Sequence, residues 1–322
     1  TGKQLGLPTG YLYEMDSFQQ VKDAYAKQCA YFVRWHATTV NLFEMVSREY
    51  MPLPVVSVTM DGCFESGKDV LSGGAKYNST GSSGVGCANL GDSLTAIQYL
   101  CFDKKRCTTR TLYDAMMADW EGYEDIHRLC IDEVPHYGND IDYADENCAW
   151  AMEVFAREFL KCTGARGNPF EAGLYPVSTH ISHGRRCIAS PDGRKKGEPL
   201  ADGVSPRQQM DKNGPTAILH SVAKLPHALY RNGTLLNMKF SPKTIEGDEG
   251  TDKLISLFQT YFALGGMHVQ YNVISSETLR DAQKRPEEYQ NLVIRIAGFS
   301  AYFVDLYPDL QNDLIRRTEI EC

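Results

Sequence analysis

Features typical of membrane, nucleic-acid-binding and disulfide-rich proteins are missing from this sequence. No apolar run approaches the roughly 20 residues that a membrane helix needs. The 33 basic residues are outnumbered by 41 acidic ones, and the net charge of -8 does not favour binding to nucleic acid or an anionic membrane. Residues 1–6 include no initiator methionine and no apolar signal-peptide core. We therefore expect a cytoplasmic protein, with a bacterial microcompartment as the alternative, and a start at an interior point of a longer chain.

The 10 cysteines form no CxxC pair and no regular framework, which predicts reduced, mostly buried thiols and no structural zinc site. His180 and His183 stand close together, but their spacing is not the i, i+4 of a helical metal site and no carboxylates accompany them. We interpret both as polar loop residues. We expect no bound metal and no permanently bound cofactor.

Hydrophobic patterns alternate between helical and strand-like along the chain. Thr108 and Asp142 are plausible helix caps, and Pro52 and Pro54 break the first long helix. Predicted helices cover residues 18–50, 92–101, 109–118, 124–134, 142–162, 251–264, 277–290 and 304–318. Predicted strands cover residues 55–60, 174–181, 217–222, 234–240, 267–275 and 292–296. Strands that alternate with helices indicate an α/β fold with a mostly parallel sheet and no clean internal boundary.

The strongest functional signal lies near the end of the chain, in Val293-Ile294-Arg295-Ile296-Ala297-Gly298-Phe299-Ser300-Ala301. Taken alone, this string favours a turn glycine between two elements. It also resembles the fingerprint of glycyl radical enzymes, the pyruvate formate-lyase-like family. A Cα radical is stabilised by delocalisation into both flanking amides, and only glycine offers two Cα hydrogens and the backbone freedom that a planar centre needs.

Ordered matches over about 250 residues strengthen the resemblance, and several point to the dehydratase and choline lyase branch of the family. Residues 73–78 are similar to its glycine-rich segment, and residues 172–178 to a barrel strand that reaches the active site. Residues 191–195 and 197–203 are similar to a long loop of the dehydratase-like enzymes. Residues 236–240 and 265–272 also match that branch.

The resemblance implies a mechanism with two radical sites. A partner enzyme that uses S-adenosylmethionine and an iron–sulfur cluster would install the radical on Gly298. The glycyl radical would then take hydrogen from a cysteine across the barrel, and the thiyl radical would take hydrogen from the substrate. In the dehydratase-like branch, a glutamate helps to deprotonate the substrate hydroxyl while the leaving group departs from the adjacent carbon.

The catalytic cysteine and glutamate of the family are not evident in this sequence. Their motif is Gly-Cys, an apolar residue and Glu, which Gly62-Cys63-Phe64-Glu65 resembles. In the family, however, the catalytic loop precedes the segment that residues 1–10 resemble, whereas residues 61–69 match a later helix start. We therefore interpret Cys63 as a buried structural thiol. We expect the catalytic pair upstream or on a separate subunit.

Two residues are candidates for the substrate pocket. The phenol of Tyr175 could hydrogen-bond a substrate hydroxyl or carbonyl while its ring shields the radical from water. A buried core tyrosine with a satisfied hydroxyl is the alternative. Glu171 faces the same side if residues 171–175 form a strand, and its charge argues against an anionic substrate. For Glu171, a solvated carboxylate at the start of the strand is the alternative.

These observations predict the C-terminal part of the glycyl radical enzyme barrel, in which two half-barrels of parallel strands enclose the radical site. Residues 1–180 would belong to the pyruvate formate-lyase-like barrel domain and residues 181–322 to the glycine radical domain. Gly298 would lie on a loop in the barrel centre, with the last 24 residues packed over it as a helix. We expect a homodimer.

The predicted activity is elimination of water or an amine from a small hydroxylated substrate, such as glycerol, propane-1,2-diol or choline, with an aldehyde as product. Diol dehydration is the first choice. One alternative is carbon–carbon chemistry, as in formate C-acetyltransferase or an arylacetate decarboxylase. Another is a non-catalytic rescue module that supplies a fresh glycyl site to a damaged enzyme, although the chain carries more barrel strands than that role needs. The whole enzyme would be anaerobic and oxygen-sensitive.

Overall fold

The computed structural model describes residues 3–320, so the predictions about Thr1, Gly2 and Cys322 fall outside the described residues. The helices are α1 (Phe18–Tyr50), α2 (Pro54–Ser57), α3 (Cys63–Ser66), α4 (Cys87–Ala96), α5 (Thr109–Met117), α6 (Glu124–Asp132), α7 (Asp142–Phe159), α8 (Thr179–Gly184), α9 (Gly214–Ala223), α10 (Gly247–Ala263), α11 (Ser276–Lys284) and α12 (Pro308–Arg316). The strands are β1 (Thr80–Ser83), β2 (Phe170–Gly173), β3 (Leu236–Phe240), β4 (Val269–Val273), β5 (Val293–Arg295), β6 (Ser300–Tyr302) and β7 (Glu319–Ile320).

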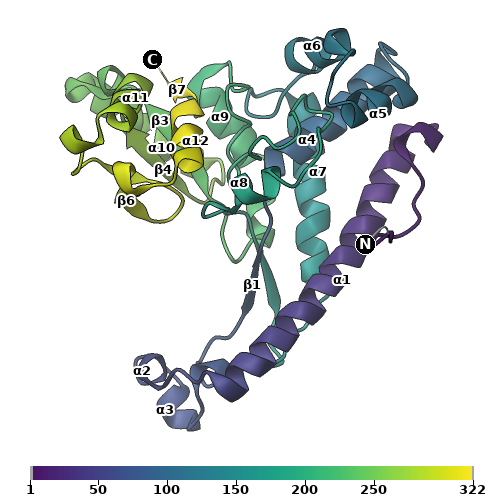
Figure 1. The fold of residues 1–322 in the computed structure, drawn as a ribbon. Coiled ribbons are helices and arrows are strands. Elements are labelled where there is room, and N and C mark those ends of the chain that lie inside the picture. The colour runs from purple at the N-terminus through teal and green to yellow at the C-terminus, as the bar shows by residue number, and fades with distance from the viewer. Residues whose placement is uncertain (1–2, 321–322) are drawn as a thin grey trace.

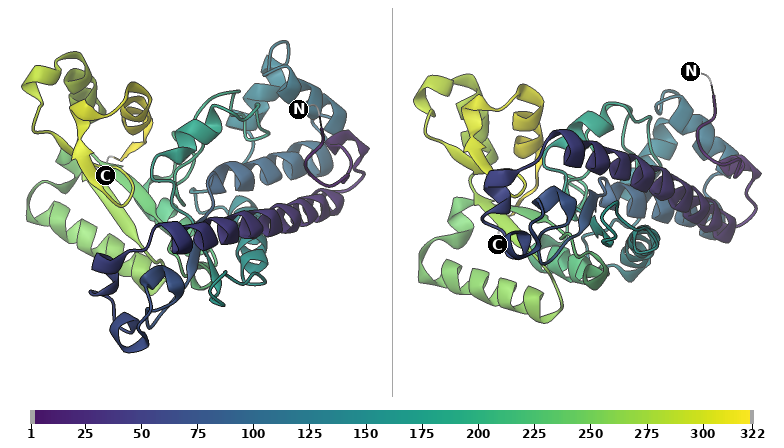
Figure 2. Two further views of the ribbon diagram at one scale, coloured as in Figure 1. Left: turned by 60° about the horizontal axis from the view of Figure 1, so that its bottom comes forward. Right: turned by 90° about the horizontal axis from the view of Figure 1, so that it is seen from below.

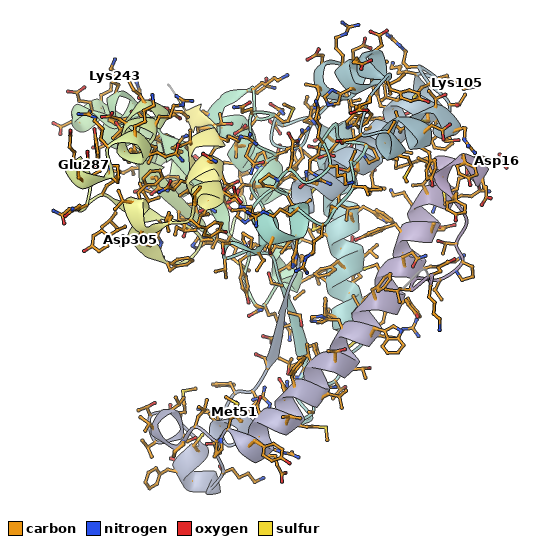
Figure 3. All side chains as sticks on the ribbon, viewed as in Figure 1. Asp16, Met51, Lys105, Lys243, Glu287 and Asp305 are labelled. Atoms are coloured by element: carbon orange, nitrogen blue, oxygen red, sulfur yellow. The ribbon has the colours of Figure 1, made fainter. Side chains whose placement is uncertain are left out.

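Helix α1 has the bounds predicted from its apolar periodicity, and Ser17 caps it by accepting a hydrogen bond from the Gln20 amide. It packs against α7, and its C-terminal end carries α2 and α3 away from the other elements (Figure 1). Met51 marks this projecting end in Figure 3, far from Asp305 in the C-terminal part. Apolar side chains at this end are exposed, among them Tyr50, Val55 and Phe64. Within the described residues, the arm of α2 and α3 therefore has no core of its own.

The strands form three small sheets, two of them parallel. Strand β1 pairs with β2, and the order of the second sheet is β4-β3-β7. Strands β5 and β6 form an antiparallel hairpin. Figure 2 shows the second sheet between α10 on one side and α11 and α12 on the other. Helices joined to parallel strands confirm the predicted α/β class.

Two hydrophobic clusters hold these elements. The larger cluster joins α1, α4, α7, β2 and β3, and its buried residues include Leu100, Phe170 and Leu236. The smaller cluster lies between the hairpin, α11 and α12. Its buried members are Ile181, Leu235, Ile274, Leu279, Ala282, Ile294, Ile296, Ala297, Phe303, Leu310 and Leu314. This second core fixes the base of the β5–β6 hairpin.

Two predicted strands are helices. Residues 55–60 contain α2 and turns, because Pro54 starts a helical turn and Val55 has no strand beside it but is 78% exposed. Residues 217–222 lie in α9, which has Pro215 in its first turn and buries its apolar side chains. A short, wholly buried helix carries the same apolar run as a buried strand, which explains the second error.

Other predicted bounds shift by several residues. The strand predicted for residues 174–181 is not present. The strand β2 ends before it, at Gly173, and α8 begins at Thr179. Pro176 and the positive φ of Val177 (55°) separate the two. Helix α11 ends at Lys284, before Pro286, and the tail contains α12 and the strand β7 rather than one helix. Thr108 caps α5 as predicted, but the N-cap of α7 is Ile141 rather than Asp142.

Candidate functional site

Gly298 lies at the tip of the β5–β6 hairpin. Arg295 pairs with Ser300, and the Ile296 amide donates to the Phe299 carbonyl at 2.9 Å, so residues 296–299 form a tight turn. Gly298 is the third residue of this turn and has φ +82°, in the left-handed region that tight turns reserve for glycine or asparagine. The local fold alone therefore accounts for a glycine at this position.

The surroundings of Gly298 are open on the side where a Cβ would point. The nearest atom to such a Cβ is Leu235 Cδ1 at 3.9 Å, an ordinary contact. The glycine itself is exposed in the described chain, whereas the preceding Ala297 is buried in the smaller core. Helix α12 packs beside the hairpin base and leaves Gly298 uncovered. The prediction that Gly298 lies in a barrel centre stays a prediction.

Two polar side chains of β4 form hydrogen bonds with the β5–β6 hairpin. Gln270 Oε1 accepts hydrogen bonds from the Gly298 amide (3.0 Å) and from Arg295 Nε (3.2 Å). Gln270 Nε2 donates to the Ile296 carbonyl at 3.2 Å. Two residues along the same strand, Asn272 bonds to both the amide and the carbonyl of Arg295, at 2.9 and 2.8 Å. These bonds thus tie the turn and the β5 arm of the hairpin to β4.

A buried polar network continues from Gln270 into the interior. Gln270 Nε2 donates to Asn237 Oδ1, and Asn237 Nδ2 donates to Asp202 Oδ2. Asp202 Oδ2 lies 3.4 Å from Arg317 NH2, which also lies 3.2 Å from Asp313 Oδ2. We call Gln270, Asn237, Asp202, Arg317 and Asp313 the glutamine network. All of its members are buried.

The charged end of the glutamine network is stable as an ionised group. Burial alone would raise the pKa of Asp313, but the adjacent His180 and the charge of Arg317 outweigh it and lower the pKa. Burial alone would lower the pKa of Arg317, but Asp202 and Asp313 outweigh it and raise the pKa. The Arg317 NH1 group also donates to the Ile296 carbonyl at 3.3 Å. Arg317, paired with the carboxylates of Asp202 and Asp313, therefore contacts the turn through the Ile296 carbonyl.

Tyr175 follows β2 rather than lying on it. Its hydroxyl accepts a hydrogen bond from Asn232 Nδ2 at 2.6 Å, and its ring lies 2.5 Å from where a Cβ on Gly173 would stand. Its neighbour Leu174 accepts a hydrogen bond from the Leu235 amide at 3.0 Å, and Leu235 is the side chain that faces Gly298. Tyr175 thus packs against the smaller core, and Leu235 of that core is the residue nearest to the Cβ position of Gly298.

Glu171 lies on β2 opposite Gly81 of β1 and is partly exposed. Because β2 ends at Gly173, the expected common face of residues 171, 173 and 175 does not extend to Tyr175. The roles of Glu171 and Tyr175 in a pocket remain predictions.

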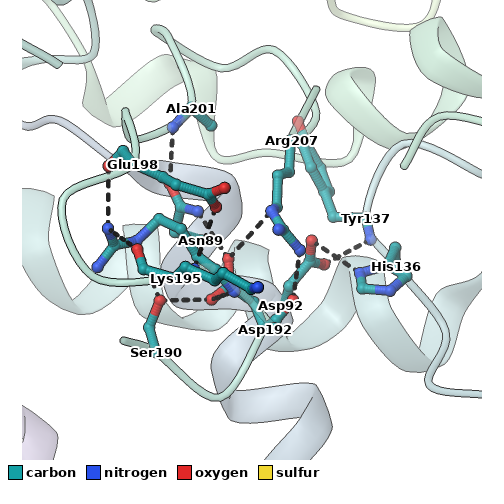
Figure 4. Close-up of polar contacts among 12 residues, drawn as sticks. Asn89, Asp92, His136, Tyr137, Ser190, Asp192, Lys195, Glu198, Ala201 and Arg207 are labelled. Carbon is teal, nitrogen blue, oxygen red and sulfur yellow. Dashed lines mark hydrogen bonds and ion pairs between the residues drawn. The ribbon is translucent and has the colours of Figure 1, made fainter. Parts of the chain in front are cut away.

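The loop over residues 185–213 is anchored to α4 (Figure 4). Asp192 is fully buried, and its carboxylate accepts hydrogen bonds from Asn89 Nδ2 (2.7 Å) and Ser190 Oγ (2.5 Å). Asn89 Oδ1 accepts from the Ala201 amide at 2.6 Å. Asp92, on the same helix, accepts from the Tyr137 amide at 2.7 Å, and the Tyr137 hydroxyl donates to the Val204 carbonyl of the loop at 3.0 Å. These anchors place Asp202 where it meets Asn237, so the loop supports the turn of Gly298 indirectly.

Cys63 lies in α3, at the projecting end of α1 and away from the hairpin (Figure 1). Its thiol is buried against its own short segment. This position agrees with its interpretation as a structural thiol, since nothing in the described residues connects it to Gly298.

Sequence reasoning misjudged His180 and assigned no role to the glutamine network. His180 is fully buried in α8, with Nε2 3.1 Å from Asp313 Oδ2, rather than in a polar loop. Among residues 3–320, the structure has no group of three or more histidine, cysteine, aspartate or glutamate side chains placed to hold a metal ion. Nor does any helix in that range have the length and apolar character to cross a membrane.

Comparison with known proteins identifies the family of this chain. Residues 1–184 match the family model described as pyruvate formate lyase-like, and residues 200–304 match the model described as glycine radical. The chain is 41% identical to (2S)-3-sulfopropanediol dehydratase of Klebsiella oxytoca, over 99% of this chain and 39% of that protein. It is 39% identical to trans-4-hydroxy-L-proline dehydratase of Clostridioides difficile, over 98% of this chain and 40% of that protein.

A solved structure extends the likeness to the fold. The glycerol-bound B12-independent glycerol dehydratase of Clostridium butyricum is 43% identical and superposes with a TM-score of 0.97, over 100% of this chain and 41% of that one. The chain therefore has the fold of the corresponding part of the glycyl radical enzyme barrel, as predicted, and it spans about 40% of the length of the relatives it matches. From these matches and from the turn that holds Gly298, the chain belongs to the pyruvate formate lyase-like family.

Proposed function

We propose that the protein containing this chain is a glycyl radical lyase that removes water from a small hydroxylated substrate, such as glycerol or propane-1,2-diol. Gly298 stores the radical, which a radical S-adenosylmethionine activating enzyme installs. The observation that carries the proposal is the placement of Gly298, a glycine at φ +82° on a hairpin tip, inside the segment that matches the glycine radical model.

The reaction needs groups from outside residues 1–322. A cysteine there passes a hydrogen atom to Gly298 and takes one from the substrate carbon, so one C–H bond breaks as one S–H bond forms. A carboxylate there accepts the proton of one hydroxyl group and passes it to the hydroxyl on the adjacent carbon, whose C–O bond breaks so that it leaves as water. The cysteine then returns the hydrogen atom, so the reaction is redox-neutral and yields an aldehyde. Within this chain, Tyr175 is the candidate to contact the substrate.

The comparisons favour elimination over carbon–carbon cleavage. Dehydratases match the chain at 39 to 41% identity, whereas the indoleacetate decarboxylase of Tractidigestivibacter scatoligenes matches at 31%. A rescue module is disfavoured because residues 1–184 match the barrel model in addition to the glycine segment. Elimination from a neutral diol remains the first choice.

The experiment is anaerobic activation of the whole protein with its activating enzyme, S-adenosylmethionine and a reductant. We expect an electron paramagnetic resonance doublet from one α-hydrogen, and formation of an aldehyde when propane-1,2-diol or glycerol is added. Gly298→Ala should lose both. Gly265→Ala is the matched control, since Gly265 also has a positive φ (+99°) and no atom within 4 Å of its Cβ position. A doublet that survives in Gly298→Ala would refute the assignment.

A further inference from the structure

We propose that Gln270 is a positioning residue for the radical glycine: its side chain holds the Gly298 amide and sets the geometry of the radical centre. The inference rests on the proposed function. It names a residue on β4, 28 positions before Gly298, that contacts Gly298 directly.

Gln270 and Asn272 make a natural comparison because both reach the hairpin from one face of β4. Alternate residues of a strand share a face, and the intervening Tyr271 faces the other way, against Phe258 of α10. Both amides bond to the hairpin, but they bond to different parts of it. Asn272 contacts only Arg295 in the stem, whereas Gln270 contacts Gly298 and Ile296 in the turn itself.

The orientation of the Gln270 amide is determined by its partners. Its oxygen receives two donors, the Gly298 amide and Arg295 Nε. Its nitrogen faces two acceptors, Asn237 Oδ1 and the Ile296 carbonyl. A rotated amide would place NH₂ against two donors and oxygen against two acceptors, so only one orientation satisfies this buried group.

The orientation is fixed further back by charge. Asp202 is buried beside Arg317, and an ionised carboxylate only accepts hydrogen bonds. Asn237 must therefore turn its nitrogen toward Asp202 and its oxygen toward Gln270. Gln270 must in turn present its nitrogen to Asn237 and its oxygen to Gly298. The charge of Asp202 thus fixes the orientation of the Asn237 side chain, which fixes that of Gln270, so that the Gln270 oxygen faces the backbone amide of Gly298.

This acceptor has a direct effect on the radical. A Cα radical is delocalised into the nitrogen of its own amide, and a hydrogen bond accepted from that N–H raises the electron density on the nitrogen. The same bond limits rotation about the N–Cα bond of Gly298. Both effects act on the spin density at Cα, which the α-hydrogen splitting reports, and on the lifetime of the radical.

The test compares variants of the whole protein after anaerobic activation. Gln270→Met keeps the length and the packing of the side chain but removes the acceptor. We expect an altered α-hydrogen splitting and a radical that decays roughly tenfold faster, because the Gly298 amide loses its buried acceptor. Asn272→Leu removes two bonds to the hairpin stem and should leave the spectrum unchanged.

The inference is overturned if Gln270→Met has the wild-type splitting and decay, or if Asn272→Leu changes them equally. If Gln270→Met does not fold, Asp202→Asn replaces it. That substitution frees the amide series to rotate without touching the hairpin, and a wild-type spectrum from it would overturn the inference. Absence of a radical in the wild-type protein would instead refute the proposed function, so the two failures are distinct.

Discussion

Replacement of Gly298 by alanine should abolish the radical while leaving the protein folded. An alanine at φ +82° costs roughly 1–2 kcal/mol of backbone strain. The added methyl group costs little more, because its nearest neighbour is Leu235 Cδ1 at 3.9 Å. Such a change should lower the melting temperature of a protein this large by only about 2 °C.

Substitutions at two other glycines serve as references for this loss of stability. Gly265→Ala carries the same kind of strain in open space and should destabilise the protein equally. Gly203→Ala should be far worse, since its Cβ would lie 2.1 Å from the Leu235 carbonyl oxygen, and we expect a cost of roughly 3 kcal/mol or more.

The assay is thermal unfolding of the three variants beside the wild type, before activation. If the melting temperature of Gly298→Ala is as low as that of Gly203→Ala, the claim that a Cβ at Gly298 meets no close atom is wrong. The loss of its radical would then say nothing about chemistry.

Three further predictions concern the residues around the turn. If the phenol contacts the substrate, Tyr175→Phe should lower kcat at least about tenfold. Asn232→Ala removes the same internal hydrogen bond, at a cost of about 1 kcal/mol in stability, and should leave kcat unchanged. Equal kcat values for both variants would show that Tyr175 is a core residue. Burial raises the pKa of Asp211 to about 6, above its unfolded value, so the free energy of unfolding should fall as the pH rises from about 4 to 6. In urea unfolding measured over this pH range, Asp211→Asn should remove most of that fall. The same fall in the variant as in the wild type would contradict this prediction. Asp313→Asn leaves Arg317 and His180 without one carboxylate and should cost about 3–5 kcal/mol in urea unfolding, and a cost below about 1 kcal/mol would show that the charged end of the glutamine network is dispensable.

The sequence correctly predicted the helix with the longest apolar periodicity and the family to which the chain belongs. Helix α1 kept its apolar spacing over its whole length, and Gly298 stood in a string that matched one family. Short apolar runs failed, because residues 55–60 and 217–222 have the composition of strands but begin beside proline at a helical start.

The glutamine network could not be predicted, because its members come from four separate segments of the chain and only the fold brings them together. Gln270 could be expected near the core, but its bond to Gly298 depends on the register of β4 and the curl of a turn 28 residues later. His180 gave the opposite error, since a histidine among polar neighbours gives no sign of a buried aspartate that lies 133 positions later along the chain.

Cleavage by oxygen tests the central claim, that Gly298 stores the radical, most directly. A glycyl radical exposed to air reacts with oxygen and the backbone breaks at that residue. Mass spectrometry of the activated, air-exposed protein should therefore show a fragment that ends at Gly298, and this fragment should be absent from the unactivated sample and from Gly298→Ala. A radical-bearing sample that stays full-length in air, or that breaks at another residue, would contradict the account.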